Sequence, residues 1–245
     1  ITPSLACIVQ GAIGAKNAVA FDINAACAAF VYALGMAHMY LANGYKRILI
    51  ISAEALSKIT DYTDRSTCVL FGDAAGACIV TSSEKKFASA LGADGTGANT
   101  LFAGRPLNDI PFVGQADPQS VDHFPDVNRP GVLYMNGREV YKFAVSAMSH
   151  ALKDACEKFG TSPEELDLIV PHQANLRIIQ SAAKELGLPL ERFFVNIDKY
   201  GNTSSACIPV GLAQLDAAGK LIPGRKIGMV GFGAGLVYGG CVFEL

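Results

Sequence analysis

Short apolar segments alternate with longer helical ones, and this alternation limits the possible folds more than any other feature of the sequence. "VAFDI" (19–23) and "LDLIV" (166–170) are predicted strands, and each is followed by a segment dense enough in apolar residues to form a helix. The continuous apolar run "RILIISAE" (47–54) is typical of a strand in a parallel sheet. We therefore expect layers of helices and mainly parallel sheets.

Glycine, proline and capping residues set the expected ends of the other elements. The first helix is predicted to begin at Thr2-Pro3 and to end at Gly11 or Gly14. Further helices are predicted at about 27–43, 137–158, 175–187 and 204–219, with a capping-box start at 162–165. Further strands are predicted on both sides of Gly72-Asp73, at 192–197, and as a glycine-hinged pair at 226–245. Residues from about 92 to 131 have no periodicity and are expected to form a surface loop near a site.

The two halves of this pattern end in similar segments. "VLFGDAAGACIV" and "GMVGFGAGLVYGG" are both predicted to be a strand, a glycine-rich turn and a second strand. Such an echo favours a duplicated unit, with a first copy that is short. Because the chain opens without Met, we also expect it to be part of a longer protein, with an incomplete first half.

Composition excludes several classes of protein. The formal net charge of −2 provides no general attraction for nucleic acid or anionic lipid, and no apolar stretch is long enough to be a membrane span. The seven cysteines contain no C-x-x-C pair and no histidines at zinc spacing. We therefore expect a cytoplasmic protein with no structural metal.

Three polar residues and a glycine-rich turn follow predicted strands. Cys27 comes after "VAFDI", His172 after "LDLIV", Asn202 after 192–197, and "GFGAG" after "IGMV". Each has an ordinary explanation by itself, as packing or turn residues. Because the carboxyl ends of strands meet at one edge of a sheet, their shared position favours an active site.

Cys27 is the candidate nucleophile. It begins a predicted helix, and the partial positive charge there favours thiolate and is expected to lower the pKa of the thiol. The other six cysteines are predicted to be structural. Cys68, Cys78 and Cys241 fall in predicted strands, and Cys7, Cys156 and Cys207 in predicted helices.

The sequence resembles a known family over nearly its whole length. "FDINAACAAF", "DRSTCVLFGDAAGACIV", "MNGREVYKFAV", "VPHQANLRII", "YGNTSSACIPVGL" and "GFGAGLVYGG" are similar, in this order, to motifs of the β-ketoacyl-acyl-carrier-protein synthase III family. The resemblance implies a thiolase-like αβαβα fold of two related halves, the first truncated at its N-terminus. Residues 1–86 would be the rest of the half that carries Cys27, and residues 87–245 the half that carries His172 and Asn202.

The resemblance also implies a reaction, in which an acyl-CoA, expected to be acetyl-CoA, transfers its acyl group to Cys27. A malonyl group on acyl-carrier protein then loses CO₂, while His172 and Asn202 donate hydrogen bonds to its thioester oxygen. The carbanion attacks the acyl group and gives β-ketoacyl-acyl-carrier protein. By the same resemblance, the backbone of Cys27 and Ala234 forms the first oxyanion site, and Phe232 is a wall of the malonyl site.

Further residues are assigned by resemblance to the acyl pocket, the pantetheine tunnel or its basic mouth: Arg65, Gly137, Tyr141, Lys142, Ala174 and Arg177. The reaction needs no metal or redox cofactor, since the CoA thioester and the phosphopantetheine-linked malonyl group are substrates. The implied partners are acyl-carrier protein and a second copy of the chain, in a homodimer. Three alternatives stay open: a polyketide-type ketosynthase, a cysteine thioester hydrolase, and a catalytically silent homologue.

Overall fold

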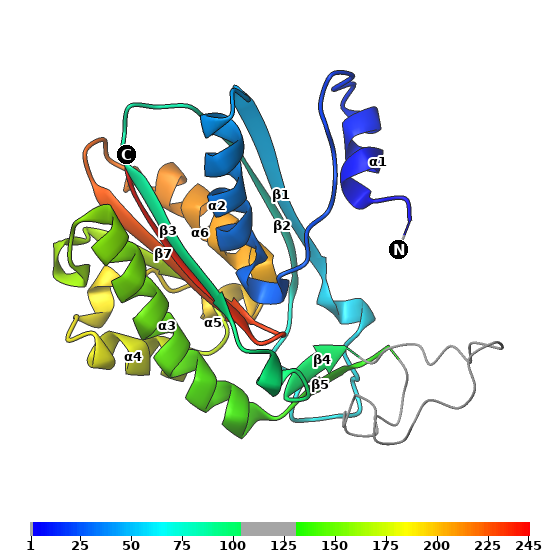
Figure 1. The fold of residues 1–245 in the computed structure, drawn as a ribbon. Coiled ribbons are helices and arrows are strands. Elements are labelled where there is room, and N and C mark those ends of the chain that lie inside the picture. The colour runs from blue at the N-terminus through cyan, green and yellow to red at the C-terminus, as the bar shows by residue number, and fades with distance from the viewer. Residues whose placement is uncertain (1, 104–130) are drawn as a thin grey trace.

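The computed structural model describes residues 2–103 and 131–245, and its centre is a four-stranded sheet between helices (Figure 1). The α-helices are α1 (Leu5–Ala12), α2 (Ala29–Ala42), α3 (Gly137–Phe159), α4 (Leu176–Glu185), α5 (Ile197–Tyr200) and α6 (Cys207–Ala217). The strands are β1 (Arg47–Ala55), β2 (Asp73–Thr81), β3 (Phe87–Ala93), β4 (Leu101–Ala103), β5 (Leu133–Met135), β6 (Leu168–Pro171), β7 (Lys226–Gly233) and β8 (Val237–Glu244). The 3₁₀ turns are η1 (Ala26–Ala28), η2 (Leu56–Lys58), η3 (Gly95–Gly97), η4 (Pro163–Glu165), η5 (Leu190–Arg192) and η6 (Ser204–Ala206).

The sheets are mostly antiparallel. The four-stranded sheet has the order β3-β8-β7-β6, and of its pairs only β6 with β7 is parallel. β1 and β2 form a separate antiparallel ribbon, as do β4 and β5. The prediction of mainly parallel sheets is therefore wrong for the described part of the chain. β7 and β8 are joined by a tight turn, which forces adjacent strands to run in opposite directions.

The elements stack in layers, as the alternating pattern predicted. In Figure 1, α2 and α6 lie between the β1–β2 ribbon and the four-stranded sheet, and α3 and α4 cover the other face of that sheet. One core cluster joins α2 and α6 to the sheet through residues such as Phe30, Ile208 and Met229. The other joins α3 and α4 to it through residues such as Leu152 and Ile179. The layered α/β prediction is confirmed.

Most predicted helices are present, with ends near the expected stop signals. Gly160 and Gly187 follow α3 and α4 with φ of 78° and 70°, and Gly44 follows α2 with φ of 93°. The start of the first helix was predicted wrongly, because Ser4 is its cap and accepts a hydrogen bond from the Cys7 amide. The capping-box segment forms only the single turn η4.

Three predicted strands do not form. Residues 19–23, 68–72 and 192–197 have no strand assignment, apart from isolated bridges at Phe71 and Phe193. A strand needs a continuous ladder of backbone hydrogen bonds to a neighbour, and residues 68–72 and 192–197 make only single bridges, to Asn202 and Ile169. Asp22 instead caps α1, because its carboxylate accepts from the amides of Leu5 and Ala6 at 2.8 Å. Cys68 is therefore not in a strand.

β1 is a strand as predicted, but it pairs antiparallel with β2 and is not covered on both faces. The side chains of Leu49, Ile51 and Ile79 are 44%, 41% and 68% exposed. The predicted loop at 92–131 contains the end of β3, η3 and β4, and residues 104–130 lie outside the described residues. In the described part of the chain, no helix is both long and apolar enough to cross a membrane.

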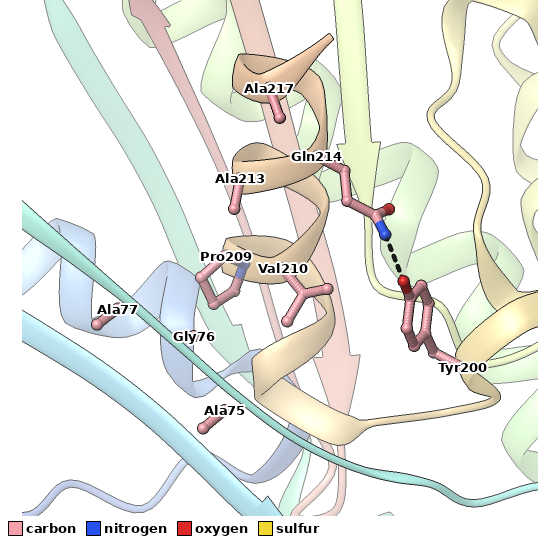
Figure 2. A pocket seen from close by; sticks show the side chains of 9 residues that line it. All are labelled: Ala75, Gly76, Ala77, Tyr200, Pro209, Val210, Ala213, Gln214 and Ala217. Atoms are coloured by element: carbon pink, nitrogen blue, oxygen red, sulfur yellow. Dashed lines mark hydrogen bonds between the residues drawn. The ribbon is translucent and has the colours of Figure 1, made fainter.

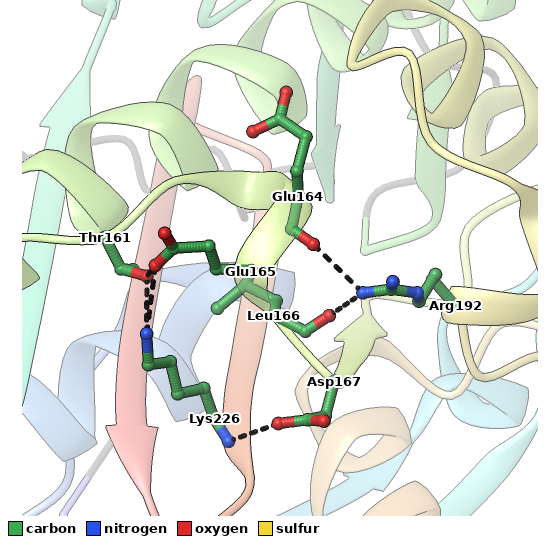
Figure 3. Close-up of polar contacts among 7 residues, drawn as sticks. All are labelled: Thr161, Glu164, Glu165, Leu166, Asp167, Arg192 and Lys226. Atoms are coloured by element: carbon green, nitrogen blue, oxygen red, sulfur yellow. Dashed lines mark hydrogen bonds and ion pairs between the residues drawn. The ribbon is translucent and has the colours of Figure 1, made fainter.

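Polar contacts fix the start of β7, at the end remote from the candidate site (Figure 3). The Lys226 amide donates to Asp167 Oδ2 at 2.9 Å, and its Nζ lies 3.0 Å from Glu165 Oε2. Glu165 also accepts the Thr161 hydroxyl at 2.5 Å. Arg192 donates to the carbonyls of Glu164 and Leu166. These contacts anchor the strand whose other end reaches Cys27.

Candidate active site

Cys27 lies in η1, the 3₁₀ turn that leads into α2, and its side chain is partly buried. The preceding Ala26 has φ of 42°, an unusual value for a residue other than glycine. The Asn24 side chain accepts a hydrogen bond from the Ala26 amide at 3.2 Å. The turn therefore presents Cys27 before the regular helix begins.

The end of β7 passes directly against this turn. A Cβ built on Gly233 would lie 2.6 Å from the Cys27 nitrogen, and one on Gly231 would lie 3.4 Å from the Ala28 Cα and 3.8 Å from the His172 Cβ. Only a glycine backbone allows an approach as close as that at Gly233. The strand thus brings Cys27 and His172 to the same place.

His172 directly follows β6 and is held beside β7 by its amide, which donates to the Val230 carbonyl at 2.8 Å. Its side chain is 1% exposed, and its ring meets the Phe232 ring edge-on at 5.3 Å. Burial lowers the pKa of His172 to about 4, and a hydrogen bond with the backbone of Ser204 acts in the opposite direction. The imidazole is therefore neutral at physiological pH.

Asn202 comes from the second half of the chain but is fixed by the first. Its amide donates to the Leu70 carbonyl at 2.8 Å, and its carbonyl accepts from the Gly72 amide at 2.9 Å. Its side-chain Oδ1 accepts from the Ser204 amide at 2.9 Å. Because Oδ1 is engaged in this way, the Nδ2 group is the part of the side chain that is left to donate to a ligand.

Ser204 links the three predicted catalytic residues. It is 4% exposed, and its φ of 51° places a residue other than glycine in the left-handed region. Its amide donates to Asn202 Oδ1, its backbone raises the pKa of His172, and its side chain lowers the pKa of Cys27. No sequence pattern singled out this residue, although it stands within "YGNTSSACIPVGL".

The predicted lowering of the Cys27 pKa is wrong. Burial raises the pKa of this thiol to about 11, the Ser204 side chain opposes the rise, and the negative charge of Glu54 adds to it. Desolvation of the thiolate thus outweighs the position of Cys27 before a helix. The residues that bury Cys27 come from distant parts of the sequence, and no local pattern reveals them.

Cys207, which was expected to be structural, is buried beside the His172 ring. It begins α6, it is 2% exposed, and its Sγ lies 3.0 Å from His172 Nδ1. The same sulfur accepts from the Gln173 amide at 3.3 Å. Burial raises the pKa of Cys207 far above that of a free thiol. Cys207 is therefore a protonated neighbour of the His172 ring.

The residues assigned to the oxyanion and malonyl sites are close to this group. Phe232 is 2% exposed and contacts both His172 and Phe143 through its ring. Ala234 follows Gly233 in the turn between β7 and β8. The structure thus gathers Cys27, His172, Asn202, Phe232 and the Ala234 turn around one end of β7, while their chemical roles stay predictions.

The outer residues are more scattered. Gly137 begins α3, and the Tyr141 hydroxyl lies 2.8 Å from the Ser181 hydroxyl of α4. Lys142 pairs with Glu139 at 3.0 Å. Ala174 is partly buried near the start of α4, Arg177 is exposed on α4, and Arg65 is exposed in the segment before β2. Their predicted contacts with CoA or carrier protein stay untested.

A cavity of about 350 Å³ lies elsewhere, between β2 and α6 (Figure 2). Its lining is mostly small and apolar, with one polar pair in which Gln214 Nε2 donates to the Tyr200 hydroxyl at 2.8 Å. None of the predicted catalytic residues lines it. Among the described residues, no group of three or more His, Cys, Asp or Glu could hold a metal ion.

Comparison with known proteins identifies the relatives of this chain. Residues 21–95 match the family described as 3-oxoacyl-[acyl-carrier-protein (ACP)] synthase III, and residues 156–245 match its C-terminal family. The β-ketoacyl-[acyl-carrier-protein] synthase III of Clostridium acetobutylicum is 46% identical over 99% of this chain and 73% of its own length. That of Syntrophomonas wolfei is 45% identical over 99% and 71%. The crystal structure of the Thermus thermophilus protein of this name matches with a TM-score of 0.88 and 44% identity, over all of this chain and 73% of that one.

Proposed function

The chain belongs to the 3-oxoacyl-[acyl-carrier-protein] synthase III family, and from this premise we propose how its own residues perform the reaction. It has the thiolase-like fold of these relatives and is an acyltransferase, the initiating condensing enzyme of fatty acid synthesis. It acts on acyl-carrier protein and CoA thioesters. The observation that carries the proposal is the meeting of Cys27 and His172 at the end of β7, with Asn202 fixed by the adjacent Ser204 amide.

In the first half-reaction, Cys27 is the nucleophile. Its sulfur attacks the thioester carbonyl of acetyl-CoA, the C–S bond to CoA breaks, and CoA leaves as a thiol with the proton that Cys27 gave up. The amides of Cys27 and Ala234 donate to the oxyanion. The Ser204 hydroxyl stabilises the Cys27 thiolate, because its hydrogen bonding lowers the pKa of this thiol. Covalent attachment splits one difficult condensation into two easier steps.

In the second half-reaction, the malonyl thioester loses CO₂. His172 and Asn202 donate hydrogen bonds to its thioester oxygen, where negative charge develops as the C–C bond breaks. A neutral imidazole with one N–H suits this role, and the low pKa of His172 keeps the ring neutral. The carbanion then attacks the acetyl group, and Cys27 leaves as a thiolate. Phe232, against the His172 ring, is a wall of the malonyl site.

The other assignments follow from the same family membership. Residues 1–86 carry the nucleophile and 87–245 carry the decarboxylating donors, as parts of two related halves. The outer residues contact the acyl group, the pantetheine arm or the carrier protein: Arg65, Gly137, Tyr141, Lys142, Ala174 and Arg177. The enzyme needs no metal or redox cofactor and works as a homodimer in the cytoplasm, which free thiols at all seven cysteines fit.

A cysteine thioester hydrolase fits the site less well. Such an enzyme needs a histidine that takes the proton of the nucleophile and activates water. A histidine whose pKa is about 4 is a weak base, and its Nδ1 lies against Cys207. The surroundings of His172 therefore favour a hydrogen-bond donor over a general base.

Product analysis with acetyl-CoA and malonyl-carrier protein tests the proposal. Condensation gives acetoacetyl-carrier protein and CO₂, whereas a hydrolase gives free acetate. His172→Ala and Asn202→Ala should each slow malonyl decarboxylation by about 10²- to 10³-fold, the usual effect of removing an oxyanion donor. Acetylation of Cys27, followed by mass spectrometry, should survive in both variants. If acetylation is lost as completely as in Cys27→Ser, the assigned roles are wrong.

A further inference from the structure

Glu54, near the end of β1, bonds to the turn that follows Asn202. Its Oε1 accepts the Ser205 hydroxyl at 2.5 Å and the Ser205 amide at 3.3 Å. The two residues are 151 positions apart in the chain, and Ser205 is 3% exposed. A partly buried carboxylate of the first half thus holds a buried turn of the second half by two hydrogen bonds.

This turn needs such support because of its backbone. Ser204 has φ of 51°, a conformation that is unfavourable for residues other than glycine. The same conformation directs the Ser204 amide onto Asn202 Oδ1 at 2.9 Å. If Ser204 relaxed to a negative φ, this amide would turn away and Asn202 would lose the contact that fixes its side chain. The hydrogen bonds to Ser205 oppose that relaxation from the next residue along.

We propose that Glu54 is a positioning residue for decarboxylation: through Ser205 and Ser204 it holds Asn202 with Nδ2 directed at the malonyl thioester. The inference rests on the proposed role of Asn202. It gives the first half of the chain a part in the second half-reaction, in addition to supplying Cys27.

The charge of Glu54 has a second, separable effect. Cys27 is faced by Glu54 of β1, Ser204 of η6, His172 after β6 and Cys207 of α6. His172 is neutral and Cys207 is protonated, so the charge that acts on Cys27 among these neighbours is that of Glu54. Its negative charge raises the pKa of Cys27. A substitution of Glu54 can therefore remove its charge near Cys27 while it keeps an acceptor for the hydrogen bonds from Ser205.

Two variants separate these effects. Glu54→Ala removes both acceptor and charge, and malonyl decarboxylation should slow by about 10- to 100-fold, as expected for a misplaced donor. Acetylation of Cys27 should not slow. Glu54→Gln keeps an oxygen that accepts from Ser205, so decarboxylation should return to near the wild-type rate. The pH profile of Cys27 alkylation should still shift to lower pH, because the charge is gone, and a purely structural role would not produce this shift.

Glu165→Ala is the matched control. Glu165 also accepts a hydroxyl at 2.5 Å, from Thr161, but it lies at the remote end of β7 (Figure 3). This variant should decarboxylate malonyl-carrier protein at the wild-type rate. If Glu54→Ala does not fold, as judged by thermal melting, Ser205→Ala replaces it. That variant loses one hydrogen bond to Glu54 and should slow decarboxylation about fivefold.

The outcomes are distinguishable. The inference is overturned if Asn202→Ala is impaired but Glu54→Ala decarboxylates at the wild-type rate. Where Glu54→Ala does not fold, the same result in Ser205→Ala overturns it. Equal losses in Glu54→Ala and Glu165→Ala also overturn it, since the effect would then be general. Wild-type decarboxylation in Asn202→Ala overturns the proposed function itself. Slow decarboxylation in Glu54→Ala with rescue in Glu54→Gln supports the inference.

Discussion

The helices α2 and α6 begin in the same way, but the cysteines at their starts have different roles. α2 follows η1 and α6 follows η6, and each 3₁₀ turn has a residue other than glycine with positive φ, Ala26 at 42° and Ser204 at 51°. A cysteine lies at each of these helix starts: Cys27 in η1 and Cys207 directly after η6. The two helix starts lie side by side at the end of β7, where Cys27 and His172 meet.

Their surroundings differ. Cys27 is partly buried, and its pKa is about 11. Cys207 is 2% exposed, its pKa is raised further, and its sulfur is engaged by His172 and Gln173. The same local backbone therefore gives one thiol that a substrate can reach and one that only orders its neighbours. Burial and contact partners, more than the position at a helix start, decide which cysteine reacts.

The largest expected effect comes from removing the Cys27 thiol, with removal of the Cys207 thiol as the comparison. Cys27→Ala should abolish the acetyl-enzyme and slow condensation by at least about 10³-fold, because the nucleophile is lost. Cys207→Ala should still form the acetyl-enzyme, since the buried Cys207 sulfur is engaged by His172 and Gln173. Mass spectrometry of each variant after incubation with acetyl-CoA measures this. An acetyl group on Cys207, or on neither residue of the wild-type protein, would contradict the comparison.

A smaller effect, about tenfold per pH unit, is expected in thiol reactivity. Since the thiolate is the nucleophile and the pKa of Cys27 is about 11, its alkylation by iodoacetamide should rise about tenfold for each pH unit up to pH 10. Cys207 should stay unlabelled over the same range in the folded protein. Peptide mapping at several pH values distinguishes the two. A rate for Cys27 that is already level between pH 6 and 7 would show that its thiolate forms far more readily than its burial predicts.

The smallest expected effect concerns the backbone of the two turns. Ala26→Gly removes the strain of a positive φ and should stabilise the protein by up to about 1 kcal/mol. Ser204→Gly relieves similar strain but loses the hydroxyl that contacts Cys27, so no net gain is expected. Urea unfolding with an unchanged m value measures both. A larger gain from Ser204→Gly than from Ala26→Gly would mean that the Ser204 hydroxyl contributes nothing to folding.

Local signals in the sequence predicted the helices and the C-terminal hairpin well. These signals lie within the segments themselves: the apolar density of α2 and α6, the length of α3, and the glycines that follow α3 and α4. The failed strands have a common cause. Residues 19–23 and 192–197 have suitable composition, but a strand forms only where a continuous hydrogen-bonded ladder to a neighbouring strand is made, and that depends on distant residues.

The same distinction explains what could be predicted of the site. His172 does follow a strand, β6, as expected, whereas neither Cys27 nor Asn202 follows a strand of the described structure. The resemblance to a known family, more than the argument from strand ends, therefore identified those two residues. Ser204, Glu54 and Cys207 were missed because their roles depend on contacts made after folding, such as the one between Glu54 and Ser205.

The contact between Gly233 and Cys27 can form only after the ribosome has synthesised β7. The nucleophile precedes in sequence the backbone that meets it, because that backbone belongs to β7, which is synthesised after the α-helices of the described ranges. The bonds from Asn202 to Leu70 and Gly72, and from Ser205 to Glu54, also wait for distant residues. Contacts between remote parts of a chain form slowly, because a long loop must close first. A nascent chain therefore exposes Cys27 on the ribosome well before it can condense anything, and activity appears only once β7 has been made and has docked.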